Sequence, residues 1–236
     1  SGAGRVCLLT RDRDKILEEV AALRKLGFPA EFTEKTPLPI PVAGAVRFPR
    51  QGQIHPLRFL GAVARGLRIY EETKVEELAP GLAKTARGTI RAEKILIATH
   101  FPILNKHGGY FLKLYQSRSY VLALENAPEL NGMYLDEDEK GLSFRNYRGM
   151  LLLGGGSHRT GKQGGGWREL EGFARKHYPD AQEAARWATQ DCMTLDNVPY
   201  IGLYSRGTAG LYTATGFNKW GMTSSMAAAE VLTDLV

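Results

Sequence analysis

The closing part of the sequence places a short apolar strand pattern directly before a helical pattern, and this pairing limits the folds that the chain can adopt. The run GLYTA (210–214) alternates as strands do, TGFNKWGMT (215–223) follows it, and SSMAAAEVLTDL (224–235) is typical of a helix. A strand that passes straight into a helix indicates an α/β layer. The glycines of the joining segment leave two interpretations open: an ordinary turn with its aromatics in the core, or a place where a bound group contacts bare backbone.

Met222 and Thr223 would lie in the first turn of that helix. N–H groups in a first helical turn lack intrahelical acceptors and carry the positive end of the helix dipole. Such a position favours an anion or an electron-rich heteroatom. Under the second interpretation, a ligand would contact the chain at this turn.

The composition fits a globular protein with a real core. Of the 236 residues, 43% are hydrophobic and 24% are charged, which suits one large domain or two small ones. The 31 lysines and arginines outnumber the 25 acidic residues, for a formal charge of +6, but they are scattered along the chain. We interpret this excess as a solvated surface; binding to nucleic acid or another polyanion is the alternative.

The chain carries few residues that could form a disulfide framework or a metal site. Cys7 and Cys192 are its only cysteines, and the five histidines show no metal-ligand spacing. No apolar run approaches the roughly 20 residues needed to span a bilayer, and the first residues do not resemble a signal peptide. We therefore expect no metal, no membrane association and a reducing, cytoplasmic location. Both ends look cut, so we expect the natural protein to be longer.

The start of the sequence predicts a strand followed by a helix. Residues 6–10 read as the strand. Asp12 or Asp14 can cap a helix that carries an apolar stripe as far as Leu26, and Gly27 is expected to end it.

The next part of the sequence predicts a connector, a helix and a buried strand. The segment 36–56 is rich in proline and glycine, which indicates an extended connector without helix or central strand. A second helix is expected over residues 56–66. KILIA (94–98) has the pattern of a strand buried on both faces.

The middle of the sequence changes to a pattern of antiparallel strands. Residues 110–125 and 132–156 read as such strands with polar turns, and no segment between them is long enough for a crossover helix. Residues 167–179 and 181–193 are predicted to be amphipathic helices. The predicted fold class is therefore α/β plus α+β, with helix-flanked buried strands that interleave with a mainly antiparallel sheet.

A second glycine-containing segment is a weaker candidate for a binding site. GSHRTGKQ (156–163) matches seven of the eight positions of a phosphate-binding P-loop, but Gln163 has no hydroxyl for magnesium and three glycines follow it. A turn between a strand and a helix is the better interpretation. The aromatics that alternate with Lys113 and Arg118 are likewise better explained by a half-buried strand than by a base-stacking surface.

Six ordered blocks of the sequence resemble one family. They are GAVRFPRQGQIHPLRFLGAVA (44–64), RIYEETKVEEL (68–78), GTIRAEKILIATH (88–100), RSYVLAL (118–124), TLDNVPYIG (194–202) and LYTATGFNKWGMTSSMAAAEVL (211–232). In their order and spacing the chain is similar to the FAD-dependent D-amino acid oxidase and glycine oxidase family, especially its DadA-like bacterial branch, which often carries a Rieske module. The resemblance implies an incomplete FAD-binding Rossmann-like region, interleaved with a mainly antiparallel substrate domain.

The resemblance also implies two groups of cofactor-binding residues. Ala98 and Thr99 would lie near the dinucleotide, although His100 stands where glycine is common in the family. The closing block would lie against the isoalloxazine ring and its ribityl chain through Gly216, Phe217, Asn218, Lys219, Gly221, Met222 and Thr223. A helix N-terminus near flavin N1 and the C2 carbonyl would stabilise reduced flavin, and Lys219 could add to this effect.

One part of the family's pattern is missing from the sequence. The G-x-G-x-x-G turn, which holds the ADP half of FAD, has no counterpart, because Gly2-Ala3-Gly4 follows no strand and lacks the third glycine. We therefore expect a truncated flavoenzyme that binds FAD weakly or not at all in isolation. The surface that the missing unit would cover is expected to be apolar, and it could drive homo-oligomer formation or non-native association.

The resemblance implies oxidation of a C–N bond in a small amino acid or related amine, with hydride transfer to flavin N5. A bidentate arginine is a natural clamp for a substrate carboxylate, and Arg145, ahead of Arg118, is the candidate on the sheet expected to roof the flavin. The expected substrate-domain segments are 1–40 and 106–190, and the expected FAD-domain segments are 41–105 and 191–236. A binding module for nucleic acid or another polyanion and a non-catalytic interaction domain are the alternative functions.

Overall fold

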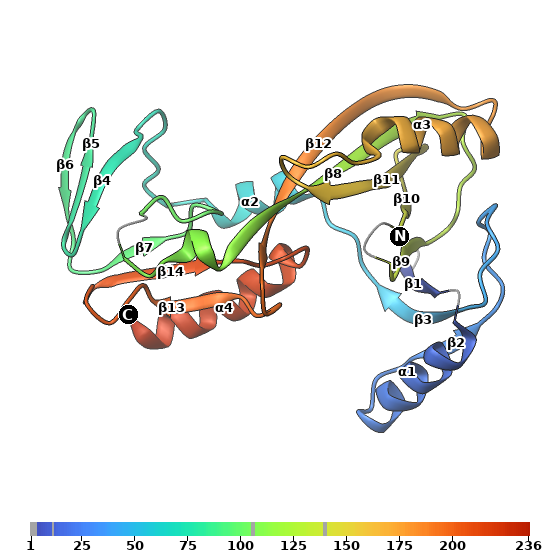
Figure 1. The fold of residues 1–236 in the computed structure, drawn as a ribbon, viewed down its shortest axis with the longest axis horizontal. Helices are drawn as coiled ribbons and strands as arrows, with labels where there is room; N and C mark the ends of the chain where they lie inside the picture. The colour runs from blue at the N-terminus through green and yellow to red at the C-terminus, as the bar shows by residue number, and fades with distance from the viewer. Residues whose placement is uncertain (1–3, 11, 105–106, 139–140) are drawn as a thin grey trace. The chain divides into compact units, whose positions relative to one another are not determined.

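The computed structural model describes residues 4–10, 12–104, 107–138 and 141–236, and the chain forms two compact units (Figure 1). Each unit combines two separate segments. The first comprises Ser1–Arg65 and Arg118–Thr189, and the second comprises Gly66–Ser117 and Gln190–Val236. The units therefore divide after residues 65, 117 and 189, whereas the expected domain segments divide after 40, 105 and 190. The assignment of these segments to a substrate domain and an FAD domain stays a prediction.

The first unit is built on an eight-stranded sheet in the order β12-β8-β11-β10-β9-β1-β3-β2. The strands are β1 (Gly4–Thr10), β2 (Glu31–Thr33), β3 (Gly44–Gln51), β8 (Leu114–Glu125), β9 (Met133–Asp136), β10 (Ser143–Tyr147), β11 (Met150–Arg159) and β12 (Gln182–Thr194). The first residues of β8, up to Ser117, and the last residues of β12, from Gln190, belong to the second unit. β3 runs antiparallel to β1 and β2, and β10 runs antiparallel to β9 and β11. Only the β1–β9 pair among the described registers of this sheet is parallel.

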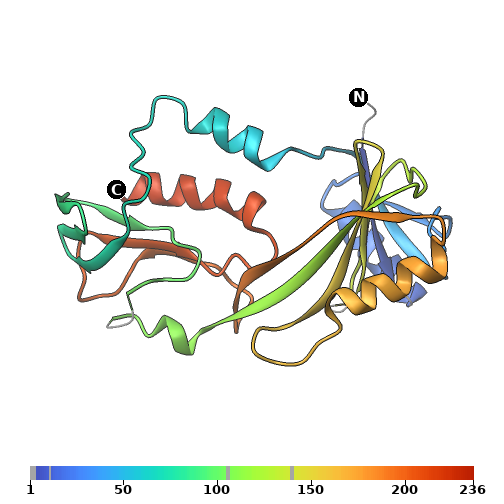
Figure 2. The same ribbon diagram turned by 90° about the horizontal axis from the view of Figure 1, so that it is seen from above.

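Helix α3 (Gly166–His177) covers one face of this sheet (Figure 2). Leu170 and Ala174 of the helix are buried in one cluster with Phe144 and Leu153 of the strands. The rings of Phe144 and Phe173 lie 5.6 Å apart between their centroids. The predicted helix at 167–179 is confirmed. Because side chains alternate along a strand, the neighbours of Phe144 in β10 point to the face of the sheet away from α3.

The first unit contains two further helices, α1 (Arg13–Lys25) and α2 (Pro56–Val63). Asp12 caps α1, because its side chain accepts hydrogen bonds from Asp14 N and Lys15 N. Ile16 and Val20 of α1 are buried with Val46 of β3. Both predicted helices are confirmed, with α2 ending a few residues earlier than expected.

Two elements of the first unit differ from the expectation. Residues 181–193 form the edge strand β12 rather than a helix. The proline-rich segment 36–56 contains the inner strand β3, which tolerates Pro49 because the pairing with β1 is irregular at that point.

The second unit contains two three-stranded sheets, in the orders β13-β14-β7 and β4-β5-β6. Its elements are β4 (Val75–Ala79), β5 (Leu82–Thr85), β6 (Gly88–Arg91), β7 (Ile95–Ile97), the short 3-10 helix η1 (Tyr110–Leu112), β13 (Tyr200–Leu203), β14 (Leu211–Thr215) and α4 (Gly221–Leu235). β14 pairs parallel with β7 and antiparallel with β13. The strand expected at 94–98 is therefore present, but Leu96 is 48% exposed, so the expected burial on both faces is wrong.

Helix α4 packs back onto β13 and β14, and Figure 1 shows it running along these strands. Ala228 and Leu232 of the helix are buried with Tyr212 and Ala214 of β14. The closing strand-to-helix unit of the sequence is thus confirmed as an α/β layer. Together the two units confirm the mixed fold class with mainly antiparallel sheets.

None of the helices within the described residues has the length and apolar composition needed to cross a bilayer.

Candidate functional site

The strand-to-helix corner at residues 215–223 is ordered by its own backbone. All residues of β14 are buried, and the chain then turns through Gly216 and Asn218, which have φ angles of +70° and +53°. Positive φ suits glycine, and asparagine tolerates it better than most residues. The turn ends where α4 begins at Gly221.

Packing around residue 216 requires a glycine, which the sequence alone did not reveal. A Cβ atom added there would lie 2.3 Å from Thr194 Cγ2 and 3.1 Å from Leu114 Cδ2. Side chains of the same unit therefore fill the space beside Gly216 on that side, and the contact of Gly216 with a flavin stays a prediction. At Gly221, by contrast, the nearest atom to an added Cβ is Phe217 Cβ at 3.9 Å, an ordinary contact.

Asn218 fastens the corner to the end of β12. Its backbone N–H donates to Cys192 O at 3.0 Å, and its Oδ1 accepts from Thr194 N at 3.0 Å. Its Nδ2 donates to Asn197 O at 3.3 Å. Asn218 thus serves the structure of the corner directly.

The start of α4 is the part of the corner that can meet a ligand. The first helical hydrogen bond runs from Ser224 N to Trp220 O at 2.9 Å, so the N–H groups of Gly221 and Met222 precede it and have no intrahelical acceptor. Trp220 provides no side-chain cap. Lys219 and Met222 are exposed, so this turn offers N–H donors and positive charge at the surface of the unit.

The end of β7 lies beside the corner. Thr213 is in register with Ile97, so Ala98 and Thr99 leave their strand at the same end of the sheet where β14 leads into the corner. Thr215 Oγ1 donates to His100 O at 2.5 Å. The structure therefore brings the two predicted sets of cofactor-binding residues together within the second unit.

His100 adopts a backbone conformation that explains why glycine suits this position. Its φ angle is +65°, in the left-handed region that few side chains occupy without strain.

The two predicted clamp residues lie in the first unit. Arg145 is exposed on β10, opposite Met133 and Leu152 in the pairing register, on the face of the sheet away from α3. Arg118 of β8 is partly buried, with its guanidinium carbon 5.7 Å from the centre of the Tyr120 ring. Their role in substrate binding stays a prediction.

Asp191 is a candidate that the sequence analysis missed. It lies near the end of β12, next to Cys192, and it is partly buried. Partial burial raises the pKa of its carboxyl, while the charges of Lys219 and His100 act in the opposite direction. The sequence analysis missed Asp191 because it predicted a helix at residues 181–193, whereas the strand β12 places Asp191 at the corner.

Within the described residues, no group of three or more histidine, cysteine, aspartate or glutamate side chains is arranged to hold a metal ion.

Comparison with known proteins decides the family. A profile for the family DAO, described as FAD dependent oxidoreductase, matches residues 3–235. The chain belongs to this family. Membership confirms the resemblance carried by the six sequence blocks, and FAD-dependent oxidoreductases are enzymes.

A curated relative and two solved structures illustrate the likeness to other members. The chain is 35% identical over 248 residues to the putative Rieske 2Fe-2S iron-sulfur protein YhfW of Bacillus subtilis (strain 168), across 94% of the chain and 47% of that protein. It therefore spans about half the length of this relative. Glycine oxidase from Geobacillus kaustophilus matches with a TM-score of 0.82 and 22% identity, over 99% of the chain and 70% of that structure. L-proline dehydrogenase from P. horikoshii matches with a TM-score of 0.80 and 18% identity, over 99% and 73%. The structural matches support the fold.

Proposed function

We propose that this chain is the part of an FAD-dependent oxidoreductase that binds the flavin ring and the substrate, and that the reaction is oxidation of a C–N bond in an amino acid or related amine. The observation that carries the proposal is the corner at residues 215–223, which follows a buried strand and ends at an uncapped helix start in a member of this family. The substrate is a small molecule, and a cytoplasmic location is proposed with it.

The residues at the corner fit the ring end of FAD. The N–H groups of Gly221 and Met222 would serve as donors to the electron-rich pyrimidine edge, and Lys219 would add positive charge. Ala98 and Thr99 would border the same group from β7. When bound, FAD supplies the chemistry by accepting a hydride at N5, while the protein orients the substrate.

The residues for the ADP half of FAD are not found in the sequence, because it has no G-x-G-x-x-G turn. Gly2-Ala3-Gly4, which the sequence analysis rejected as such a turn, lies partly outside the described residues. We therefore propose that the chain alone binds FAD weakly or not at all, and that a further segment with this turn completes the site.

Flavin retention tests the proposal. The chain would be prepared alone and joined at its N-terminus to the G-x-G-x-x-G unit of a family member, then passed through gel filtration with FAD. We expect visible flavin absorbance to co-elute in stoichiometric amount only with the joined protein, and to be lost when the glycines of the added turn are replaced by valine. A folded joined protein that retains no flavin would refute the function, and a stoichiometric complex of the chain alone would refute weak binding.

Arg145 is proposed as the carboxylate clamp, with Arg118 as the second candidate. Arg145→Ala in the flavin-loaded protein should raise the KM for an amino acid by about 10-fold or more, because a charge-assisted hydrogen bond is lost, and FAD affinity should hardly change. Arg175→Ala is the control, because Arg175 lies on α3, which covers the other face of the sheet. An unchanged KM in Arg145→Ala would remove this residue from the site.

A further inference from the structure

We propose that Asp191 accepts the proton of the substrate's ammonium group, so that the ligand recognised at the corner is a protonated amine. This inference rests on the proposed function, since it concerns the same site.

The strand geometry places Asp191 at the corner. The peptide of Cys192 is held to the corner by the hydrogen bond from Asn218 N, at 3.0 Å. Cys192 itself is buried in the core of the unit, where its Sγ lies 3.6 Å from Thr215 Oγ1. Because successive side chains of a strand point to opposite faces, the side chain of Asp191 points away from that core.

The surroundings of the Asp191 carboxylate leave it available to a ligand. Its described interactions are the charges of Lys219 and His100, and no hydrogen bond or ion pair to it occurs among the described residues. Glu77, by contrast, has a side chain that is 66% exposed and pairs with Lys84. A partly buried carboxylate without a hydrogen-bond donor is costly, so a donor from a ligand would stabilise it.

The charges around Asp191 suit a base. Burial alone would favour the protonated acid, which could not accept a proton. Lys219 from the corner and His100 from the end of β7 counter this effect and favour the carboxylate. A general base works best when it is ionised before the reaction and still binds the transferred proton well, so its pKa should be neither very low nor far above the working pH.

The proposed step is balanced. The N–H bond of the substrate ammonium breaks, and an O–H bond forms on Asp191, which leaves a neutral amine with a free lone pair. Bound flavin, the oxidant of the proposed function, would take up the hydride of the neighbouring C–H bond, which would leave the substrate as an iminium ion. The ammonium form could not react in this way, because its nitrogen lone pair is already bonded to the proton.

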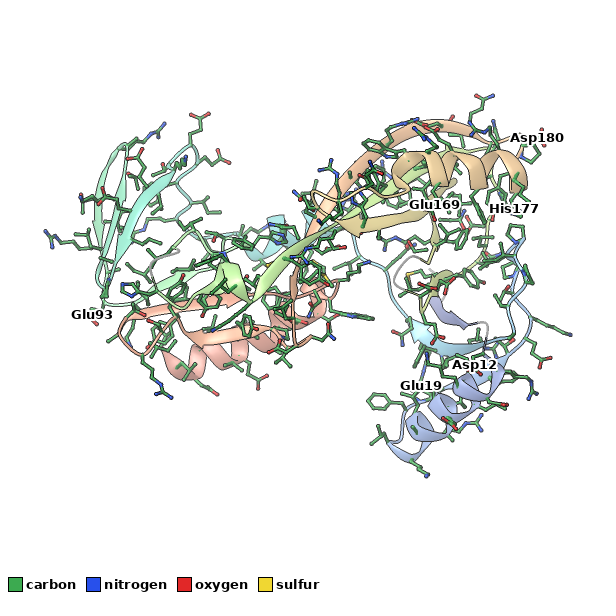
Figure 3. All side chains as sticks on the ribbon, in the orientation of Figure 1. Asp12, Glu19, Glu93, Glu169, His177 and Asp180 are labelled. Atoms are coloured by element: carbon green, nitrogen blue, oxygen red, sulfur yellow. The ribbon has the colours of Figure 1, made fainter. Side chains whose placement is uncertain are left out.

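A binding experiment tests recognition without the cofactor. The chain, labelled with 13C at aspartate Cγ, would be titrated with propylammonium chloride and separately with sodium propionate. The signal that is lost in the Asp191→Asn variant is assigned to Asp191. We expect this signal to shift when propylammonium is added and to shift much less when propionate is added. Glu93→Gln is the matched control, because Glu93 is an exposed carboxylate of the same unit (Figure 3), and it should leave the shift intact. An Asp191 signal that ignores propylammonium, or responds equally to propionate, would overturn the inference.

A kinetic experiment separates this inference from the proposed function. Anaerobic flavin reduction by an amine substrate would be followed in the flavin-loaded joined protein. Asp191→Asn should slow reduction about 100-fold near neutral pH, and the deficit should shrink at alkaline pH, where the amine is already neutral. A merely structural role would not produce this convergence. If none of the amines tested reduces the flavin of the unsubstituted joined protein, the proposed function fails. If the flavin of the Asp191→Asn variant is reduced as fast as that of the unsubstituted protein, only the role of Asp191 fails.

Discussion

Gly216 is required by packing within the second unit. Its φ angle is +70°, and an added Cβ would lie 2.3 Å from Thr194 Cγ2, closer than such atoms can approach. We expect Gly216→Ala to lower the free energy of unfolding by about 2 kcal/mol or more, from backbone strain and overpacking together. Equilibrium unfolding in urea measures this change.

Gly221→Ala is the matched control for Gly216→Ala. An added Cβ at Gly221 meets nothing nearer than 3.9 Å, so this change should stay within about 0.5 kcal/mol. Equal effects of the two substitutions would contradict the view that Thr194 fills the space beside Gly216.

Gly216 and Asp191 also show what the sequence can say about single residues. The block at 211–232 predicted which residues form the corner, because its glycines and helical pattern are local signals. The contact between Gly216 and Thr194 joins residues far apart in sequence, so no local pattern reveals it. The position of Asp191 likewise depends on the pairing of a strand that the sequence did not predict.

Among the elements, those with strong local signals were predicted and those fixed by sheet pairing were not. Helix α1 has the Asp12 cap, and α3 has an apolar stripe that Leu170 and Ala174 bury. Residues 181–193 are rich in good helix formers, yet they form the edge strand β12, because pairing in the sheet overrides a weak propensity. In the strand that forms, buried Cys192 and Thr194 alternate with the less buried Asp191 and Met193, a pattern that the sequence does not show because Met193 is apolar.

Tyr178, which follows α3, makes the stability of the protein depend on alkaline pH. Its hydroxyl is buried and is without a hydrogen-bond partner among the described residues, and burial raises its pKa from 10.0 to about 12. Because the folded-state pKa exceeds the unfolded one, its contribution is fully present below pH 10 and is lost as the pH rises through about 12. We expect Tyr178→Phe to leave stability at pH 7 unchanged or slightly higher, and to reduce the loss above pH 10.

Urea unfolding at pH 7 and at several alkaline values tests this prediction, with Tyr204→Phe for comparison. Burial also raises the pKa of Tyr204 to about 12, but its hydroxyl donates to Leu104 O. Tyr204→Phe should therefore cost about 1 kcal/mol at pH 7. A similar cost for Tyr178→Phe would contradict the absence of a partner for its hydroxyl.

Considered as a molecule, the chain presents apolar side chains on the outer side of α4 and on β7. Met226 is 53% exposed, Val231 is 42% exposed and Leu96 is 48% exposed. Such a surface favours association in water. We expect the chain to self-associate as its concentration rises, and the double variant Met226→Lys and Val231→Lys to reduce this, as measured by light scattering after gel filtration.

Phe28→Lys is the control for this association. Phe28 is 57% exposed but lies after α1 in the first unit, so its replacement should have little effect. If Phe28→Lys abolished association and the α4 variant did not, the surface of α4 would not be the one responsible.

The most direct test of the flavin site is hydrogen–deuterium exchange with and without FAD, in the chain joined to a G-x-G-x-x-G unit. We expect bound FAD to protect the amides of residues 98–100 and 215–223, because the ring covers the free N–H groups at the start of α4, while those of α1 exchange as before. Stoichiometric FAD binding that leaves both of these segments unprotected would contradict the placement of the flavin at this corner.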